Sequence, residues 1–209
     1  MDFNFSAFQE PRGVMRVLHL IFSICAFATI TGYSGSISFS CNQTAKLEFS
    51  YPFTLVDTVK LNDNGSCTAI IRNDFSSDSR FFVSTGVLAM LYSLAIMFVY
   101  VKLDEAYKAN KIIPLSDFLA TVFLAVLWIS SSAAWAHGLT GLKTVTENPV
   151  IMPDGTCCPG GITTSSFSTL NISVIFGFLN FFLWAADLWF LYKETDWFQG
   201  TAPTTTSGV

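Results

Sequence analysis

The stretch FLATVFLAVLWISSSAAWAHG, residues 118–138, contains neither a charged residue nor a proline. It belongs to a run of 25 residues without Asp, Glu, Lys or Arg, between Asp117 and Lys143. A helix on the surface of a soluble protein places charged side chains on its wet face at every turn. About 20 apolar residues in a helix cross the hydrocarbon core of a bilayer. The stretch is therefore predicted to be a transmembrane helix.

Three further charge-free runs, of 29, 21 and 32 residues, lie elsewhere in the chain. The four runs together hold 107 of the 209 residues, so all 26 charged residues are confined to the other 102. Proline is absent from each apolar segment, so each can form an unbroken helix that satisfies its own backbone groups in lipid. We predict an all-α membrane protein, a four-transmembrane-helix bundle with spans at about 14–33, 81–101, 118–138 and 172–192.

The composition excludes several functional classes. Hydrophobic residues make up 51% of the chain and charged residues only 12%, against roughly 25% in soluble domains. The net charge of −4 excludes a basic nucleic-acid binder. Four spans use about 80 residues and leave no room for a large soluble catalytic domain. No nucleophile elbow, P-loop, dinucleotide fingerprint or metal-ligand cluster is present, so we predict no enzyme, catalytic residue, metal or cofactor.

The first span could instead be a cleaved signal peptide, because a basic end precedes its apolar run and small residues follow it. Against this, 13 residues that include Asp2 and Glu10 precede it, and the run exceeds the usual 7–15 residues. We therefore expect a retained helix, with Arg16 at its end extending toward the headgroups.

The distribution of Lys and Arg predicts the orientation. The N-terminus, residues 102–117 and the C-terminus carry six, whereas the longer segments 34–80 and 139–171 carry five. The bias favours both termini in the cytosol, with the two longer segments as lumenal loops. The membrane domain is expected over residues 1–198, followed by a short tail, 199–209.

The lumenal assignment agrees with two further patterns. The sequons at Asn42 and Asn64 both fall in the first lumenal loop and are candidate glycosylation sites. A third sequon, at Asn171, lies where the fourth span begins, and we interpret Asn171 as a helix-entry residue. Four of the five cysteines also fall in the lumenal loops: Cys41, Cys67, Cys157 and Cys158.

The first lumenal loop is too long for a plain connection and should have structure of its own. Apolar and polar residues alternate at 37–40 and 47–51, which is typical of strands. A turn signal at 62–65 precedes another strand-like run at 68–71. We predict a small disulfide-bonded β-rich lumenal cap, in which Cys41 and Cys67 bridge two strands; the alternative is two free thiols.

Adjacent cysteines occupy the second lumenal loop. Cys157 and Cys158 can close on each other only through a strained ring, so each otherwise needs a partner elsewhere. A metal or redox site is the alternative, but no histidine accompanies them and the spacing is not C-x-x-C. A structural bridge is favoured, with open connectivity. Cys25, inside the first span, is expected to be a small apolar residue.

Two carboxylates border the spans near the cytosolic face. Asp117 opens the third span, where it would cap a helix N-terminus. Asp187 lies about one and a half turns from the end of the fourth, where it would reach the headgroups or a neighbouring lysine. The alternative for both is ion coupling. We favour the first interpretation because nothing polar continues the path across the bilayer.

Other polar and small residues in the spans suggest helix contacts. His19 and His137 are expected at opposite faces and so form no relay. Asn180, in the middle of the fourth span, is expected to hydrogen-bond another helix. Ser130, Ala134 and Gly138 recur every four residues, which favours close helix packing. Two matches to a proposed sterol-contact pattern, near Tyr100 and Tyr107, are close to chance in such a sequence.

A series of ordered motifs runs over residues 10–198. They are Glu10-Pro11-Arg12-Gly13, Phe27-Ala28-Thr29, Tyr33-Ser34-Gly35, Tyr51-Pro52-Phe53, Asp74-Phe75-Ser76-Ser77, Phe81-Phe82-Val83, Asp117-Phe118-Leu119-Ala120-Thr121, Trp128, Ser131-Ser132-Ala133-Ala134-Trp135-Ala136, Asn171-Ile172-Ser173-Val174-Ile175-Phe176-Gly177-Phe178-Leu179-Asn180 and Lys193-Glu194-Thr195. Together these motifs resemble the synaptophysin family of four-span vesicle proteins with a MARVEL-type membrane domain.

The resemblance implies homo-oligomers in synaptic, secretory or other cytoplasmic vesicles, with disulfide-bonded, N-glycosylated lumenal loops. It implies association with the fusion protein synaptobrevin and with cholesterol as a bound lipid, and a role in vesicle biogenesis, exocytosis, cargo retrieval and membrane organisation. Oligomeric channel behaviour is the alternative, with Asp187 and Asp117 at its cytosolic mouth. A junctional adhesion protein would instead need the cap to bind in trans.

Three features depart from the family pattern. The family commonly has Asn where Asp187 stands and Lys where His137 stands, which changes the charge at both membrane faces. Its second-loop cysteines are usually separated, unlike Cys157 and Cys158. Only Thr201 to Val209 follows the shared region, so endocytic roles that depend on a long Tyr-, Gly- and Pro-rich tail are not expected.

Overall fold

The computed structural model describes residues 11–40, 44–61, 67–102, 112–152 and 161–194. The helices in these ranges are α1 (Pro11–Thr31), α2 (Ser76–Lys102), α4 (Ile112–Glu147) and α5 (Ser168–Glu194). The strands are β1 (Ser34–Ser40), β2 (Thr44–Ser50), β3 (Thr54–Lys60), β4 (Thr68–Asp74), β5 (Val150–Met152) and β6 (Ile162–Thr164).

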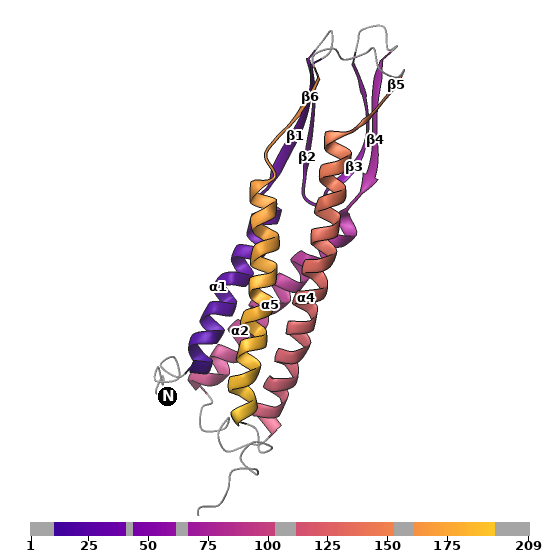
Figure 1. Ribbon diagram of the computed structural model, residues 1–209. Coiled ribbons are helices and arrows are strands. Elements are labelled where there is room, and N and C mark those ends of the chain that lie inside the picture. Colours follow the sequence, from indigo (N-terminus) through magenta and orange to yellow (C-terminus); the bar gives the residue numbers. More distant parts are fainter. Residues whose placement is uncertain (1–10, 41–43, 62–66, 103–111, 153–160, 195–209) are drawn as a thin grey trace, which may run out of the picture.

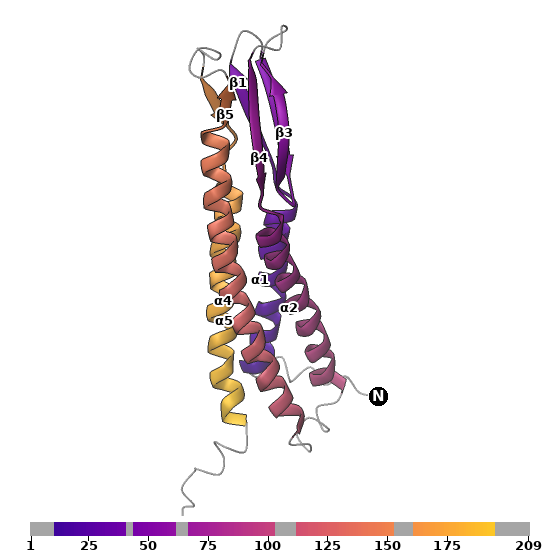
Figure 2. The ribbon, with the colours of Figure 1, turned by 90° about the vertical axis from the view of Figure 1, so that its right-hand side faces the viewer.

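The four helices form an antiparallel bundle, and the strands extend from one end of it (Figure 1). Helix α1 packs on α2 and α5, and α4 packs on the same two helices. The strands run roughly along the helix axes, so the molecule is a long rod (Figure 2). We call the end with the strands the sheet end, and the opposite end, where α1 and α4 begin, the distal end.

Each of the four helices is long and apolar enough to cross a membrane. Helix α4 has 36 residues, which at 1.5 Å per residue is about 54 Å against a hydrocarbon core of about 30 Å. It therefore extends well beyond a bilayer that it crosses. Its last turns, in which Leu139, Leu142 and Thr146 are buried, pack at the sheet end.

The predicted spans differ from the helices at their ends. Three of them lie inside longer helices, whereas the first is displaced, since α1 begins at Pro11 and ends at Thr31 and leaves Tyr33 beyond it. Proline is favoured at the first helical position because its missing N–H has no partner there in any helix. The absence of charge locates the contact with lipid, whereas backbone hydrogen bonds and tertiary packing locate the helix ends.

The structure has two three-stranded antiparallel sheets among the described residues, whereas the sequence predicted only three strands, all in the first loop. One has the order β2-β1-β6 and the other β3-β4-β5. The predicted strands correspond to β1, β2 and β4, whereas β3 and the two strands of the second loop were not predicted. Strands β5 and β6 have only three residues each, and their partners lie more than 75 residues away in the chain, so no local pattern shows them.

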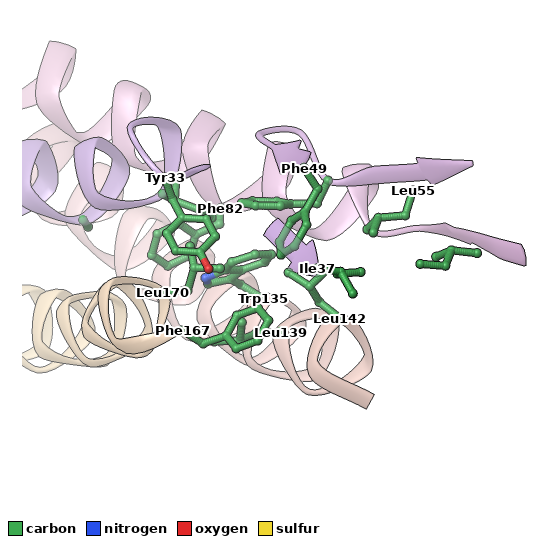
Figure 3. Close-up of a cluster of buried hydrophobic side chains, with 14 of the residues drawn as sticks. Tyr33, Ile37, Phe49, Leu55, Phe82, Trp135, Leu139, Leu142, Phe167 and Leu170 are labelled. Carbon is green, nitrogen blue, oxygen red and sulfur yellow. The ribbon is translucent and has the colours of Figure 1, made fainter. Parts of the chain in front are cut away.

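Aromatic side chains join the helix bundle to the sheets (Figure 3). Tyr33 lies between α1 and β1, and its ring centroid is 6.2 Å from those of Phe49 and Phe53 and 6.3 Å from that of Phe167. Phe53 stacks on Trp135 of α4 at 5.4 Å. We call these five residues the aromatic cluster. All are buried, so bundle and sheets share one apolar core.

Glycines let the helices approach closely at two levels. A Cβ atom on Gly177 of α5 would collide with Ser132 Oγ and the ring of Phe82, and one on Gly138 of α4 would lie 2.7 Å from Asp78 Oδ2. The predicted stripe is only partly internal, because Ala134 is half-buried and Ser130 is exposed. A four-residue repeat drifts by about 40° per step around a helix of 3.6 residues per turn, which turns Ser130 outward.

Candidate functional site

Ionisable and aromatic side chains from all four helices meet inside the bundle near the distal end. Arg16, Asp117 and Asp187 lie within about two turns of the helix ends there. We call the group the charge cluster. Its members are Arg16 and His19 of α1, Tyr92 and Tyr100 of α2, Asp117 and Thr121 of α4, and Trp184 and Asp187 of α5.

Arg16 is the centre of the charge cluster and is completely buried. Its Nη2 donates to Asp117 Oδ1 at 2.7 Å and to Thr121 Oγ1 at 3.0 Å. Its Nη1 lies 3.1 Å from Asp187 Oδ2. The guanidinium carbon also lies 5.4 Å from the ring centre of Trp184 and 5.6 Å from that of Tyr92. One guanidinium therefore contacts the other three helices.

Asp117 also receives two hydrogen bonds from α2. The hydroxyl of Tyr92 donates to Oδ1 and that of Tyr100 donates to Oδ2, each at 2.5 Å. The side chain is 1% exposed. Hydrogen bonds to an ionised carboxylate are about twice as strong as neutral ones, so Asp117 ties α4 to both α1 and α2.

On the other side of Arg16, Asp187 faces His19. His19 Nδ1 lies 3.8 Å from Asp187 Oδ2, and the imidazole stacks on Trp184 with ring centroids 4.0 Å apart and an interplanar angle of 9°. His137 lies twenty residues after Asp117 on α4, which is about 30 Å along the helix. His137 is therefore remote from this cluster.

The structure corrects three expectations for the charged residues. Arg16 does not reach the headgroups, and Asp187 is buried and forms an ion pair with Arg16. Asp117 does not cap α4, because the helix begins five residues earlier, at Ile112. The reason is common to all three: a charge inside an apolar bundle is stabilised by an opposite charge and not by exposure. The packing of α1 between α2 and α5 brings those opposite charges together.

Sequence reasoning missed the aromatic members of the charge cluster. Tyr92 and Tyr100 are eight residues apart, which places them on nearly the same side of α2, and they are the only tyrosines in that helix. Two phenolic hydroxyls eight residues apart in a membrane-spanning helix were the available signal. In the sequence, Tyr100 stands out only through its match to a sterol-contact pattern. Arg16 and His19, three residues apart on α1, form a similar pair.

Asn180 makes a separate polar contact between helices. Its Nδ2 donates to the carbonyl oxygen of Phe22 in α1 at 3.1 Å and to that of Phe176 in its own helix at 2.8 Å. Asn171 lies three residues into α5, and its Oδ1 accepts a hydrogen bond from Lys143 Nζ at 2.6 Å. These contacts hold α5 against α1 in mid-bundle and against α4 at the sheet end.

Several predicted sites lie outside the described residues: Cys41, Asn42, Asn64, Cys157 and Cys158. Cys67 takes part in a disulfide, and its predicted pairing with Cys41 stays a prediction. Cys25 is free and half-buried in α1. No group of three or more His, Cys, Asp or Glu side chains suited to a metal occurs within the described part of the chain.

The geometry of the charge cluster suits it to hold helices together in a medium without water. Removing one partner of a buried ion pair leaves an uncompensated charge, so α1, α4 and α5 depend on one another. A model of the membrane-associating domain MARVEL matches residues 7–190, which includes both sheets, the charge cluster and all four helices except the last turn of α5. The chain therefore belongs to the MARVEL family and is a multi-pass membrane protein.

Proposed function

We propose that the protein is a non-enzymatic, oligomeric organiser of synaptic, secretory or related transport vesicles. In this role it acts in vesicle biogenesis, exocytosis and the trafficking of a synaptobrevin-type fusion protein. Cholesterol is the candidate bound lipid. The proposal is finer than the family assignment, since it adds a compartment and a partner to a membrane-associating domain.

The observation that carries this proposal is where the synaptophysin-like motifs fall in the fold. Phe53 of Tyr51-Pro52-Phe53 stacks on Trp135, and the carbonyl of Pro52 accepts the Ser79 hydroxyl at 2.9 Å. The motif from Asn171 to Asn180 forms the contacts of α5 with α1 and α4. Residues shared with that family thus make the contacts that join its helices and sheets.

The proposed orientation puts the distal end in the cytosol and both sheets in the lumen. Lys102 and Lys193 lie in the last turns of α2 and α5 at the distal end, which agrees with an excess of basic residues on the cytosolic side. With this orientation the sequons at Asn42 and Asn64 are available for glycosylation, and Cys67 stands in an oxidising compartment.

The proposed contact with the fusion protein narrows to one side of α4. Gly138 and Asn180 are buried within the bundle, whereas Ser130 is exposed and Ala134 half-buried. Small side chains let two transmembrane helices approach closely. A helix of the partner would therefore pack along α4 beside Ser130, at mid-membrane depth.

An ion channel or transporter is not favoured by the geometry of a single chain. Asp117 and Asp187 are enclosed and paired with Arg16, so neither lines an open mouth. Buried hydroxyls do continue along the bundle, but those of Ser23, Thr85 and Ser173 donate to carbonyls of their own helices. The enclosure of the two carboxylates is the feature that disfavours an open ion path in a single chain.

Photocrosslinking in native vesicle membranes tests the proposal. A photoreactive amino acid in place of Ser130 should give adducts with synaptobrevin and with a second copy of the protein. The matched control replaces Ile175, which is 63% exposed on α5, and should give mostly lipid adducts. Recovery of neither protein from the Ser130 position would overturn the assignment. The orientation is checked by treating the protein with a glycosidase. The treatment should change its electrophoretic mobility, and this change should be lost in the Asn42→Gln and Asn64→Gln double variant.

A further inference from the structure

The two sheets expose chemically different outer faces. On β2-β1-β6 the outward residues are hydroxylic or charged, such as Ser36, Ser38 and the Lys46–Glu48 pair. On β3-β4-β5 they include Val56 and Val150, which are 62% and 56% exposed, and Ile70, which is paired with Val150 and diagonal to Val56. Thr54 and Thr58 lie on the same face. Exposed apolar side chains gathered on one face, and not scattered, are a sign of an interaction surface.

Two adjoining hollows cross this apolar face. Their volumes are about 250 and 430 Å³, and both are lined by Ile70, Ile71 and Arg72. The larger continues over β3 to Val56. The smaller continues to Val150 of β5 and to Val145 and Asn148 at the end of α4. Neighbouring strands are about 4.8 Å apart, so the hollows extend roughly 10 Å across the sheet.

Arg72 places a positive charge in the middle of these hollows. It stands opposite Val56 in the β3–β4 register and is exposed. Among the described residues no carboxylate forms an ion pair with it. Asp74, next on the same face, accepts the N–H of Ser76 at 2.9 Å and the Thr54 hydroxyl at 3.3 Å. Asp57 accepts the N–H of Thr58 at 2.8 Å.

We propose that this surface, the β3–β4–β5 face of Val56, Ile70, Arg72 and Val150, binds the extramembrane segment of a different protein anchored in the same membrane. The segment places apolar side chains in the hollows and a carboxylate beside Arg72. The strands run along the helix axes (Figure 2), so the face points sideways, toward neighbours in the same membrane. A protein in an apposed membrane would meet the strand tips first.

A second copy of the chain is a poor occupant of this face. Two copies in one membrane, related by a two-fold axis along the membrane normal, bring residues of equal height together. Each Arg72 would then lie level with the other, and like charges repel. The outer face of β2-β1-β6 is polar and offers no apolar side chains to the hollows.

The contact is expected to be weak in solution and effective in the membrane. A surface three strands wide is small beside a standard interface of about 1,600 Å². Anchoring both proteins in one bilayer raises their effective concentration and compensates for a small area. The inference does not depend on the vesicle assignment, because it holds for whichever membrane contains the protein.

The test uses the full-length protein in its native membrane, with a photoreactive amino acid in place of Val56. The matched control carries it in place of Ser38, on the outer face of β2-β1-β6. The Val56 position should give an adduct with another membrane-anchored protein, and the Ser38 position should not. Arg72→Glu should lower the adduct yield about tenfold or more, since a reversed charge repels the carboxylate, whereas Arg72→Lys should retain most of it.

A second measurement identifies the chemistry of the partner. In the Arg72→Lys protein, a water-soluble carbodiimide should join the new amine to a carboxylate of the same partner, which mass spectrometry locates. Adducts only with a second copy would overturn the proposal. So would equal yields from the Arg72→Glu protein, no adduct at the Val56 position, or a partner that crosslinks only across apposed membranes.

Discussion

At the distal end the four helices meet around Arg16, Asp117 and Asp187, whereas at the sheet end they meet the strands around Tyr33, Phe53 and Trp135. Both groups are buried, and both connect segments that are far apart in the chain. The first holds through ion pairs and hydrogen bonds with fixed directions. The second joins helices and strands through buried apolar area and close packing of aromatic rings.

The difference follows from what surrounds each end. Inside a membrane, lipid tails are as apolar as the helix surfaces, so burying apolar area contributes little to helix association, and polar contacts and close packing decide it. At the sheet end water surrounds the strands, and burial of aromatic area is a driving force of its own. Buried ion pairs and hydrogen bonds therefore stabilise the distal end, whereas an apolar core stabilises the sheet end.

The largest expected effect comes from removing the central charge. Arg16→Met keeps much of the volume but leaves Asp117 and Asp187 buried without their cation, which should destabilise the protein by about 3–5 kcal/mol. Thermal unfolding in detergent micelles, followed by tryptophan fluorescence, measures this. Arg16→Lys serves as the control and should lose less. If the Arg16→Met protein were as stable as the natural protein, buried ion pairs would not be what stabilises the distal end.

A matched pair of tyrosine substitutions compares the ends directly. Tyr100→Phe deletes a hydrogen bond to an ionised carboxylate and should destabilise the protein by about 1.5–3 kcal/mol. Tyr33→Phe deletes the bond from its hydroxyl to the carbonyl of Ser166, 3.1 Å away, and should destabilise it by about 0.5–1.5 kcal/mol. Equal losses of unfolding free energy in the two variants would contradict a stronger role for hydrogen bonds at the distal end.

A smaller effect is expected for an apolar exchange at the sheet end. Phe53→Leu keeps the site apolar and changes its volume moderately, so the free energy of unfolding should fall by less than about 1.5 kcal/mol. Chemical or thermal unfolding of the purified protein measures the change. A loss as large as that of Arg16→Met would mean that ring stacking, and not apolar area, holds this end together.

The smallest effect concerns acid. The N–H of Ser76 donates to Asp74 and holds the pKa of that carboxyl below its ordinary value, with smaller help from the Ser76 and Thr54 side chains and from Arg80. A lowered pKa gives stability that is present above about pH 4 and is lost as pH falls through the lowered value. Melting temperatures at descending pH should converge for the natural and Asp74→Asn proteins. Parallel curves would exclude this contribution.

Local patterns in the sequence were enough to place four helices and three of the six strands in the described part of the chain. Charge-free length locates a span because lipid excludes charge at every turn, and alternation locates a strand because side chains alternate across a sheet. The same patterns placed Asp117 and Asp187 near one face of the membrane. They could not show that Arg16 lies between them, because no local pattern records which helices become neighbours.

The sequence by itself determined that this chain is a membrane protein, how many times it can cross, and that Tyr51-Pro52-Phe53 and the residues from Asn171 to Asn180 resemble one family. The tertiary structure decided that Arg16 is an internal cation, that Tyr92 and Tyr100 belong with Asp117, and that residues 150–152 and 162–164 complete two sheets. The physical reason is range. Periodicity and charge act over one or two turns, whereas an ion pair or a strand pair joins residues about a hundred positions apart and exists only once the helices have packed.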